Sequence, residues 1–118
     1  MSTSQEAAAA RLVEERASLT AQLARMEQDL TDLFAASRDT NADDEHDPEG
    51  QTIAYERSQL SSLIDRARAH LAQIDAAMTR LTDGRYGLCE VCGEPIAPAR
   101  LEARPTARTC VAHAAVNQ

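Results

Sequence analysis

Apolar residues recur at helical spacing through the first third of the chain. Residues 1–38 contain neither Gly nor Pro, and the run Ala7–Ala10 strongly favours a helix. From Leu19 onward the steps between apolar positions alternate between four and three, which is typical of a coiled-coil seam. The seam positions are Leu12, Leu19, Leu23, Met26, Leu30 and Leu33. The pattern predicts a helix over about 4–38.

The same spacing returns later in the chain, with a cleaner period. The start is marked by Asp47, a good N-cap residue, and by Pro48, which suits the first helical position. Gly84 supplies a left-handed stop at the other end. The seam positions are Ile53, Leu60, Ile64, Ala67, Leu71, Ile74, Met78 and Leu81. We expect a second helix over about 48–83.

An acidic connector separates the two predicted helices. Six of the eleven residues from Asp39 to Glu49 are acidic, and none is a large hydrophobic residue. Because the connector is short, the helices, each roughly 50 Å long at 1.5 Å per residue, should lie antiparallel. The sequence therefore predicts a mainly α fold in which residues 1–83 form a long coiled-coil hairpin with an acidic tip at 39–47. Pairing of the seam between two molecules remains an alternative.

Metal-binding chemistry is concentrated in the last third of the chain. Cys89 and Cys92 form one close pair, and after 17 intervening residues Cys110 and His113 form another. This spacing is typical of a structural zinc site, in which four ligands close a tetrahedron and leave no position for a substrate. His113 stands where a fourth Cys would be usual, and the alternative is three reduced thiols beside an unrelated histidine. We expect residues 84–118 to form a small zinc-finger module with one structural Zn²⁺.

Composition and charge narrow the classes of function. The net charge is −7, and all twelve basic residues are Arg. Residues 1–83 hold eight Arg against sixteen acids, which argues against DNA as the main partner because phosphate binding needs a basic surface. The sequence shows neither an apolar run long enough for a bilayer nor a signal segment. Paired thiols without a disulfide framework favour the cytoplasm, and the absence of a nucleophile–base set or a phosphate loop predicts no enzyme.

Two stretches of the last third carry a specific signature. They are Asp83-Gly84-Arg85-Tyr86-Gly87-Leu88-Cys89-Glu90-Val91-Cys92-Gly93-Glu94-Pro95-Ile96 and Arg100-Leu101-Glu102-Ala103-Arg104-Pro105. Together they closely resemble the zinc finger of the DksA/TraR family, and the predicted hairpin agrees in architecture with the DksA branch. The resemblance implies a bacterial transcription regulator of the stringent response that binds RNA polymerase. Such a factor inserts its hairpin into the secondary channel and modulates initiation, in the cytoplasm and at the nucleoid through polymerase, without sequence-specific DNA binding.

The resemblance also implies a role for the acidic tip. Known members carry Asp-x-x-Asp-x-Ala there, and Asp44 and Asp47 match the two aspartates while Glu49 stands where Ala is expected. Counting back from the zinc site without gaps does not place these aspartates in the family register. With the neighbouring Asp43, these residues are the candidate polymerase-contacting tip.

A second implied site concerns guanosine tetraphosphate. Arg104 matches a residue that contacts this nucleotide in such members, and Arg66 lies at a comparable place on the second helix. Gln73 and Ala114 stand where the partner lysines are usual, so we expect weak binding or none. Arg85, Arg100 and Arg108 are further candidates for contacts with polymerase or nucleotide, or ordinary solubilising charges.

Two other functions remain open at this point. One is a Gre-like transcript-cleavage factor, whose tip carboxylates would help hold a second Mg²⁺ in the polymerase active site. The other is a structural or stress-associated zinc-finger protein that uses the hairpin and finger for assembly without binding polymerase.

Overall fold

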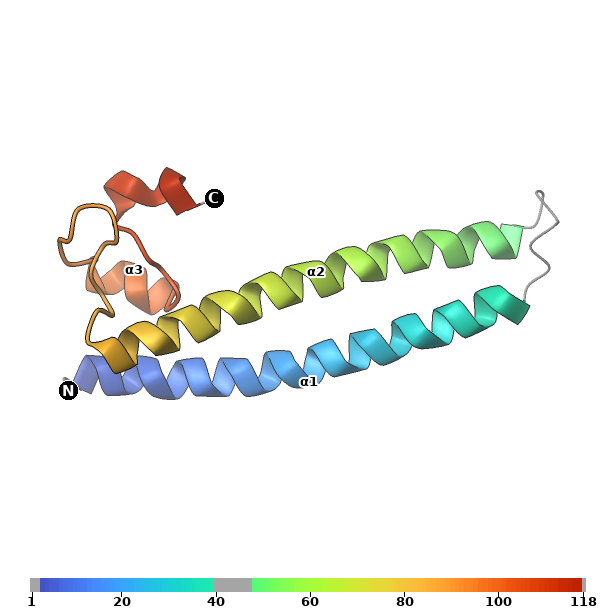
Figure 1. Cartoon of the computed structure of the whole chain (residues 1–118), viewed down its shortest axis with the longest axis horizontal. Helices are drawn as coiled ribbons and strands as arrows, with labels where there is room; N and C mark the ends of the chain where they lie inside the picture. The colour runs from blue at the N-terminus through green and yellow to red at the C-terminus, as the bar shows by residue number, and fades with distance from the viewer. Residues whose placement is uncertain (1–2, 40–47, 118) are drawn as a thin grey trace. The chain divides into compact units, whose positions relative to one another are not determined.

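The computed structural model describes residues 3–39 and 48–117, and two long helices dominate it (Figure 1). α1 spans Thr3–Asp39 and α2 spans Pro48–Asp83, followed by the short α3 (Pro98–Ala103) and a 3₁₀ helix, η1 (Val111–Asn117). The two long helices pack together and a Cys/His cluster follows them, which confirms the predicted fold class. Asp43, Asp44 and Asp47 of the predicted tip lie outside the described residues.

The chain divides into two compact units, and both long helices contribute to each. One unit comprises Met1–Ala17 and Leu71–Gln118, and the other comprises Ser18–His70. The first, called here the metal-binding unit, therefore combines the start of α1, the end of α2 and the whole C-terminal third. The second, called the two-helix unit, contains only stretches of α1 and α2. The domain boundary that the sequence suggests after Asp83 stays a prediction.

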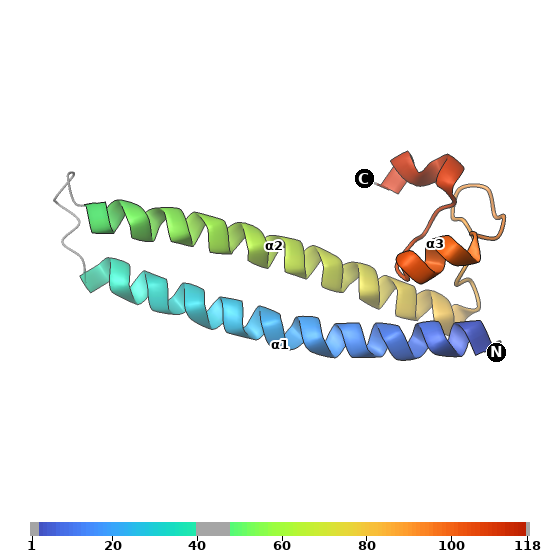
Figure 2. The same ribbon diagram turned by 180° about the vertical axis from the view of Figure 1, so that it is seen from behind.

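In the two-helix unit α1 and α2 run antiparallel. Glu27 pairs with Arg68 at 3.2 Å, and further along α1 the ring of Phe34 lies 4.5 Å from the guanidinium carbon of Arg57. Position numbers thus rise on one helix as they fall on the other, and both views show the two stretches side by side (Figures 1 and 2). Leu23, Ile64 and Ala67 are the buried apolar side chains of this unit among the described residues.

The metal-binding unit has a deeper core. Leu12 on α1 and Ile74 and Ala77 on α2 are fully buried. The C-terminal third adds Tyr86, Ile96 and Ala107 to this core. Since a pair of helices alone has no second layer to cover its seam, the C-terminal third supplies that layer for this unit.

Arg16 occupies the one position where the apolar seam of α1 is interrupted. Its Nε donates to Oδ1 of Asp75 on α2 at 2.6 Å. The hydrogen bond to this carboxylate, together with its charge, raises the pKa of Arg16. The missing seam contact is therefore replaced by a charged link between the two helices.

α2 ends in a Schellman motif. Gly84 has φ +77°, the left-handed region that side chains disfavour. The amide of Arg85 donates to the carbonyl of Arg80 at 2.9 Å, and the amide of Gly84 donates to that of Leu81 at 3.4 Å. The predicted glycine stop thus also satisfies carbonyls of the last helical turn.

α3 lies in a stretch for which the hydrophobic pattern predicts no helix. Pro98 is its first residue, the helical position at which proline is best tolerated, and good helix formers follow it. Six residues are too few to show a periodic pattern. No helix in the described part of the chain is long and apolar enough to cross a membrane.

Replacing Leu12 by Ala should lower the free energy of unfolding by about 2–5 kcal/mol, because the side chain is fully buried and the cavity would be only partly filled. The control is Val13→Ala, at a side chain that is 55% exposed, and its effect should stay within about 0.5 kcal/mol. Urea unfolding of the zinc-loaded protein, followed by circular dichroism, measures both. An equal loss of unfolding free energy in Leu12→Ala and Val13→Ala would contradict the assignment of Leu12 to the core.

Candidate metal centre

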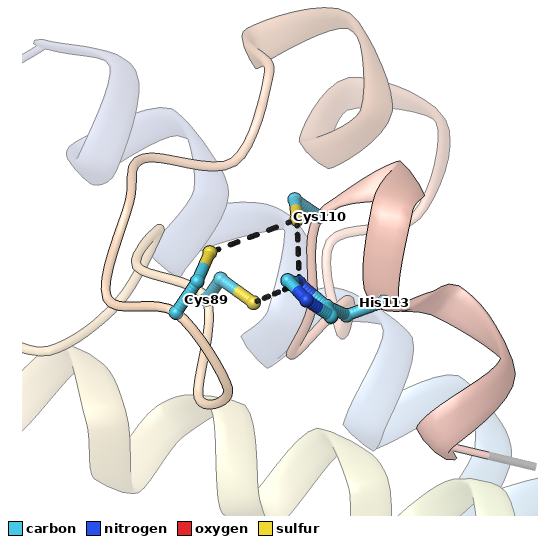
Figure 3. A group of neighbouring side chains, drawn as sticks. Cys89, Cys110 and His113 are labelled. Carbon is cyan, nitrogen blue, oxygen red and sulfur yellow. Dashed lines mark hydrogen bonds between the residues drawn. The ribbon is translucent and has the colours of Figure 1, made fainter.

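Four side chains from two separate segments converge in the metal-binding unit, and one of them, His113, belongs to η1. The ligand atoms of Cys89, Cys92, Cys110 and His113 all lie within 4.8 Å of one another. Figure 3 shows Cys89, Cys110 and His113 pointing toward a common centre. Cys89 is buried, Cys92 is exposed, and the other two are half-buried. These are the four side chains that the sequence predicts as ligands.

The distances between donor atoms fit a single tetrahedral ion. Sγ of Cys92 lies 3.9 Å from Sγ of Cys110, and Nδ1 of His113 lies 3.8 Å from Sγ of Cys89 and 3.2 Å from Sγ of Cys110. In a tetrahedron of ligands about 2.3 Å from zinc, neighbouring donors are about 3.8 Å apart. Three thiolates and one imidazole close such a site completely. The arrangement suits one structural zinc, with no open position for a substrate.

The first pair of ligands sits in a tight loop closed by backbone hydrogen bonds. The amide of Cys89 donates to the carbonyl of Glu94 at 2.8 Å, and the amide of Ile96 donates to that of Gly87 at 2.7 Å. Gly87 and Gly93 take φ values of +87° and +75°, which L side chains rarely adopt. The glycines therefore let the chain reverse twice within ten residues and bring both sulfurs to one side.

Hydrogen bonds from the backbone prepare the thiols for a metal. Burial raises the pKa of the Cys89 thiol, but amides of Cys92, Cys110 and Val91 donate to its sulfur and lower the pKa to about 6. At Cys92 a bond from the amide of Glu94 lowers the pKa, yet partial desolvation of the sulfur and the two neighbouring sulfurs, of Cys89 and Cys110, raise it and prevail. Crowded sulfurs without a cation oppose one another's ionisation, and a divalent ion relieves this.

The second pair follows an irregular segment, Pro105–Thr109, which begins in a turn and whose carbonyls are bonded to other parts of the unit. Tyr86 Oη donates to the carbonyl of Pro105 at 2.8 Å, and Arg80 Nη2 donates to that of Thr106 at 3.3 Å. The amide of Glu90 donates to the carbonyl of Arg108 at 2.9 Å. Arg100 Nε donates to the carbonyl of Thr109 at 2.8 Å. These four bonds, called here the carbonyl latch, fix the segment that carries Cys110.

Arg80 is the buried charge of this unit. Its side chain is 4% exposed and lies 3.8 Å from the carboxylate of Glu90, which is also 3.9 Å from Arg108. Burial lowers the pKa of Arg80, and the Glu90 carboxylate opposes that shift. Arg80 therefore joins the last turn of α2 to both ligand loops, through Glu90 in the first and Thr106 before the second. Sequence periodicity gave no sign of this role, since Arg80 sits beside the seam residue Leu81.

The other candidate residues do not gather at the metal. Arg66 is exposed in the two-helix unit, and Arg104 is exposed just after α3 in the metal-binding unit. Glu49 belongs to the first turn of α2, and the remaining tip residues lie outside the described ranges. Arg100 and Arg108 act within the fold, in the carbonyl latch and beside Glu90 respectively. Arg85 pairs with Asp83 at 2.9 Å.

Comparisons with known proteins agree with this geometry. The profile of the family described as "Prokaryotic dksA/traR C4-type zinc finger" matches residues 84–112. The match includes all three cysteines and ends one residue before His113. The family description and the four clustered donors together confirm one structural zinc.

Curated relatives match a part of the chain. The RNA polymerase-binding transcription factor DksA of Caulobacter vibrioides is 57% identical over 47 residues, which cover 40% of this chain and 33% of the relative. The uncharacterised protein YteA of Bacillus subtilis is 41% identical over 69 residues, or 58% of this chain and 29% of YteA. The chain thus spans about a third of the length of the curated relatives that it matches.

A solved structure matches most of the chain. Transcription factor DksA2 of Pseudomonas aeruginosa aligns with a TM-score of 0.79 and 30% sequence identity, covering 94% of this chain and 80% of DksA2. The similarity therefore includes the long helices as well as the zinc-binding end.

Replacing His113 by Ala should speed zinc release by chelators at least about tenfold, because one of four ligands is lost. His113→Cys should retain zinc at least as well as the original, since it restores the four-cysteine set of the family. His70→Ala, at an exposed histidine of the two-helix unit, is the control. Zinc content after competition with a chromophoric chelator measures all three. Unchanged retention in His113→Ala would mean that another group is the fourth ligand.

Replacing Arg80 by Met should lower the free energy of unfolding by about 1–3 kcal/mol and loosen zinc retention, because the Thr106 carbonyl and Glu90 lose a donor. Arg85→Met removes an exposed pair and should change stability by less than about 1 kcal/mol. Thermal unfolding of the zinc-loaded variants compares them. A stability loss in Arg85→Met as large as that in Arg80→Met would contradict the role of the buried charge.

Proposed function

Because this chain belongs to the DksA/TraR zinc-finger family, we propose that it is a bacterial transcription regulator that binds RNA polymerase. The observation that carries the proposal is the agreement with DksA2 over both the helical pair and the zinc-binding end. The curated relatives named as RNA polymerase-binding transcription factors include one that is 57% identical over 47 residues. A zinc finger alone would serve many functions, whereas the two parts together are specific to this family's architecture.

The proposed mode of action is insertion of the helical hairpin, tip first, into the secondary channel of polymerase to modulate initiation. The two-helix unit supports this, because it is only two helices thick and carries no further layer in its described residues. The tip would present Asp43, Asp44, Asp47 and Glu49 to the basic channel walls or to the catalytic Mg²⁺. Such a factor needs no contact with DNA bases and acts in the cytoplasm, at the nucleoid, where polymerase works.

Zinc contributes to this function through structure alone. The four donors leave no coordination position for water or substrate, so the metal does not activate a reactant. The ion instead joins two loops that the carbonyl latch ties to the end of α2. We infer that the protein acts as a binding factor and not as an enzyme.

We expect this chain to bind guanosine tetraphosphate weakly or not at all. Arg66 and Arg104 belong to different units and are both exposed, while Gln73 and Ala114 replace the lysines expected beside them. A highly anionic nucleotide held by few cations loses most of its binding energy to water and salt. Regulation by this chain should therefore depend little on the nucleotide.

The test compares wild type with an Asp44→Asn/Asp47→Asn variant on purified RNA polymerase. We expect wild type to bind at micromolar or lower concentration and to alter open-complex lifetime, and the variant to lose at least about tenfold of that effect, or 1.4 kcal/mol. Glu14→Gln/Asp65→Asn removes the same charge from exposed helical positions and should behave as wild type.

Other outcomes separate the alternatives. No binding of wild type to polymerase would overturn the proposal and favour a structural role. Full activity of the tip variant would leave polymerase binding intact but remove the role of the tip. Stimulated RNA hydrolysis in a stalled complex would identify a transcript-cleavage factor instead.

A further inference from the structure

Two large apolar side chains of α2 are exposed outside the seam between the helices. Tyr55 is 66% exposed and Leu63 is 47% exposed. They stand eight residues apart, so they lie on the same face of the helix. Gln59, halfway between them, donates from Nε2 to Oη of Tyr55 at 2.9 Å and holds the ring along that face. This stripe is distinct from the buried seam at Ile64 and Ala67.

The stripe forms one wall of a shallow groove in the two-helix unit. The groove has a volume of about 500 Å³, and α1 supplies its other wall. The apolar residues that line it are Leu33, Tyr55, Leu60 and Leu63. The two stretches that border it, around Leu33 on α1 and Leu60 on α2, lie side by side in both views (Figures 1 and 2). We call this the acidic groove, for the residues at its rim.

The rim of the acidic groove is negative. Asp29 and Asp32 border it on α1, and Glu56 borders it on α2. None of the described residues that line it is basic. The Asp32 carboxylate accepts a bond from Gln28 at 3.0 Å, a neutral donor that leaves its charge uncompensated. An apolar lining with two carboxylates on the α1 side and one on the α2 side favours an occupant that is apolar in the middle and cationic at its edges.

The shape of the groove matches a helix. Two packed antiparallel helices leave a groove between their outer surfaces, which is where a third helix lies in a bundle. An amphipathic helix bound there would cover Tyr55 and Leu63. We propose that the acidic groove docks an amphipathic helix of a partner protein, with Lys or Arg on both sides of its apolar face.

Charge rules out the other obvious occupants. A second copy of this chain carries a net charge of −7, so its own helices would bring carboxylates against carboxylates. Nucleic acid would bring phosphates to the same rim. The inference goes beyond polymerase binding and does not rest on it, because the groove selects its occupant by helical shape and charge, whichever protein carries the helix.

The direct test uses a designed peptide of about 18 residues, five helical turns, with leucines on one face and lysines on both flanks. Isothermal titration of the full, zinc-loaded chain should show one-to-one binding with a micromolar Kd. A peptide of the same composition, scrambled so that no face is apolar, should bind at least about tenfold more weakly. Equal binding of both peptides, or no binding, would overturn the inference.

Matched variants then locate the site. Tyr55→Ala/Leu63→Ala should weaken the peptide at least about tenfold, whereas Val13→Ala, at an exposed apolar residue of the metal-binding unit, should not. Asp29→Asn/Glu56→Gln should weaken peptide binding and reduce its dependence on salt. Glu14→Gln/Asp65→Asn should change neither. Circular dichroism verifies that each variant keeps its helices. Equal weakening by the control pairs would place the peptide elsewhere and overturn the inference.

Polymerase binding is measured separately on the same variants. A chain that binds the peptide but not polymerase would contradict the proposed function and leave the docking site standing. A chain that binds polymerase but not the peptide would overturn the docking site and leave the proposed function standing.

Discussion

The metal-binding unit depends on how one irregular segment, Pro105–Thr109, is held in place just before Cys110. Four of its carbonyls accept hydrogen bonds from groups on α2, the first ligand loop and α3. Arg80 is the centre of this arrangement, because it is a buried charge that reaches both ligand loops. Zinc then closes a site whose two halves are already aligned. Metal binding and attachment of the loops to the helices therefore support each other.

The two units differ in how they are stabilised. The metal-binding unit buries residues from α1, α2 and the C-terminal third, and the metal adds a further link. The two-helix unit relies on a narrow seam around Leu23 and Ile64 and on exposed pairs such as Glu27–Arg68, which contribute little. Local opening should cost less in the two-helix unit. The two-helix unit is therefore better suited to a binding surface that adapts its shape to a partner. The metal-binding unit is better suited to contacts that need a preformed surface.

The sequence predicts those parts of the structure that are marked by a hydrophobic period or by a characteristic spacing of residues. The seam residues predicted both long helices, Gly84 predicted the end of α2, and the paired ligand spacing predicted the cluster of four donors. It missed α3, which is too short to show a period, and the role of Arg80, since burial of a charge depends on loops distant in sequence. The acidic groove was also hidden, because Tyr55 and Leu63 look like isolated surface hydrophobic residues until α1 is placed beside them. Contacts between distant segments were the missing information.

The carbonyl latch has a consequence for how this protein can change in length. Its four bonds come from three different local structures, namely α2, the first ligand loop and α3, so the segment is held in one register along the backbone. Insertion or deletion of a single residue between Pro105 and Cys110 would put the carbonyls on its two sides out of register with one another, so that the four bonds and the position of the ligand could not all be kept. The number of residues between the two ligand pairs is therefore constrained. During evolution, the metal-binding unit should tolerate substitutions in this segment far more readily than insertions or deletions.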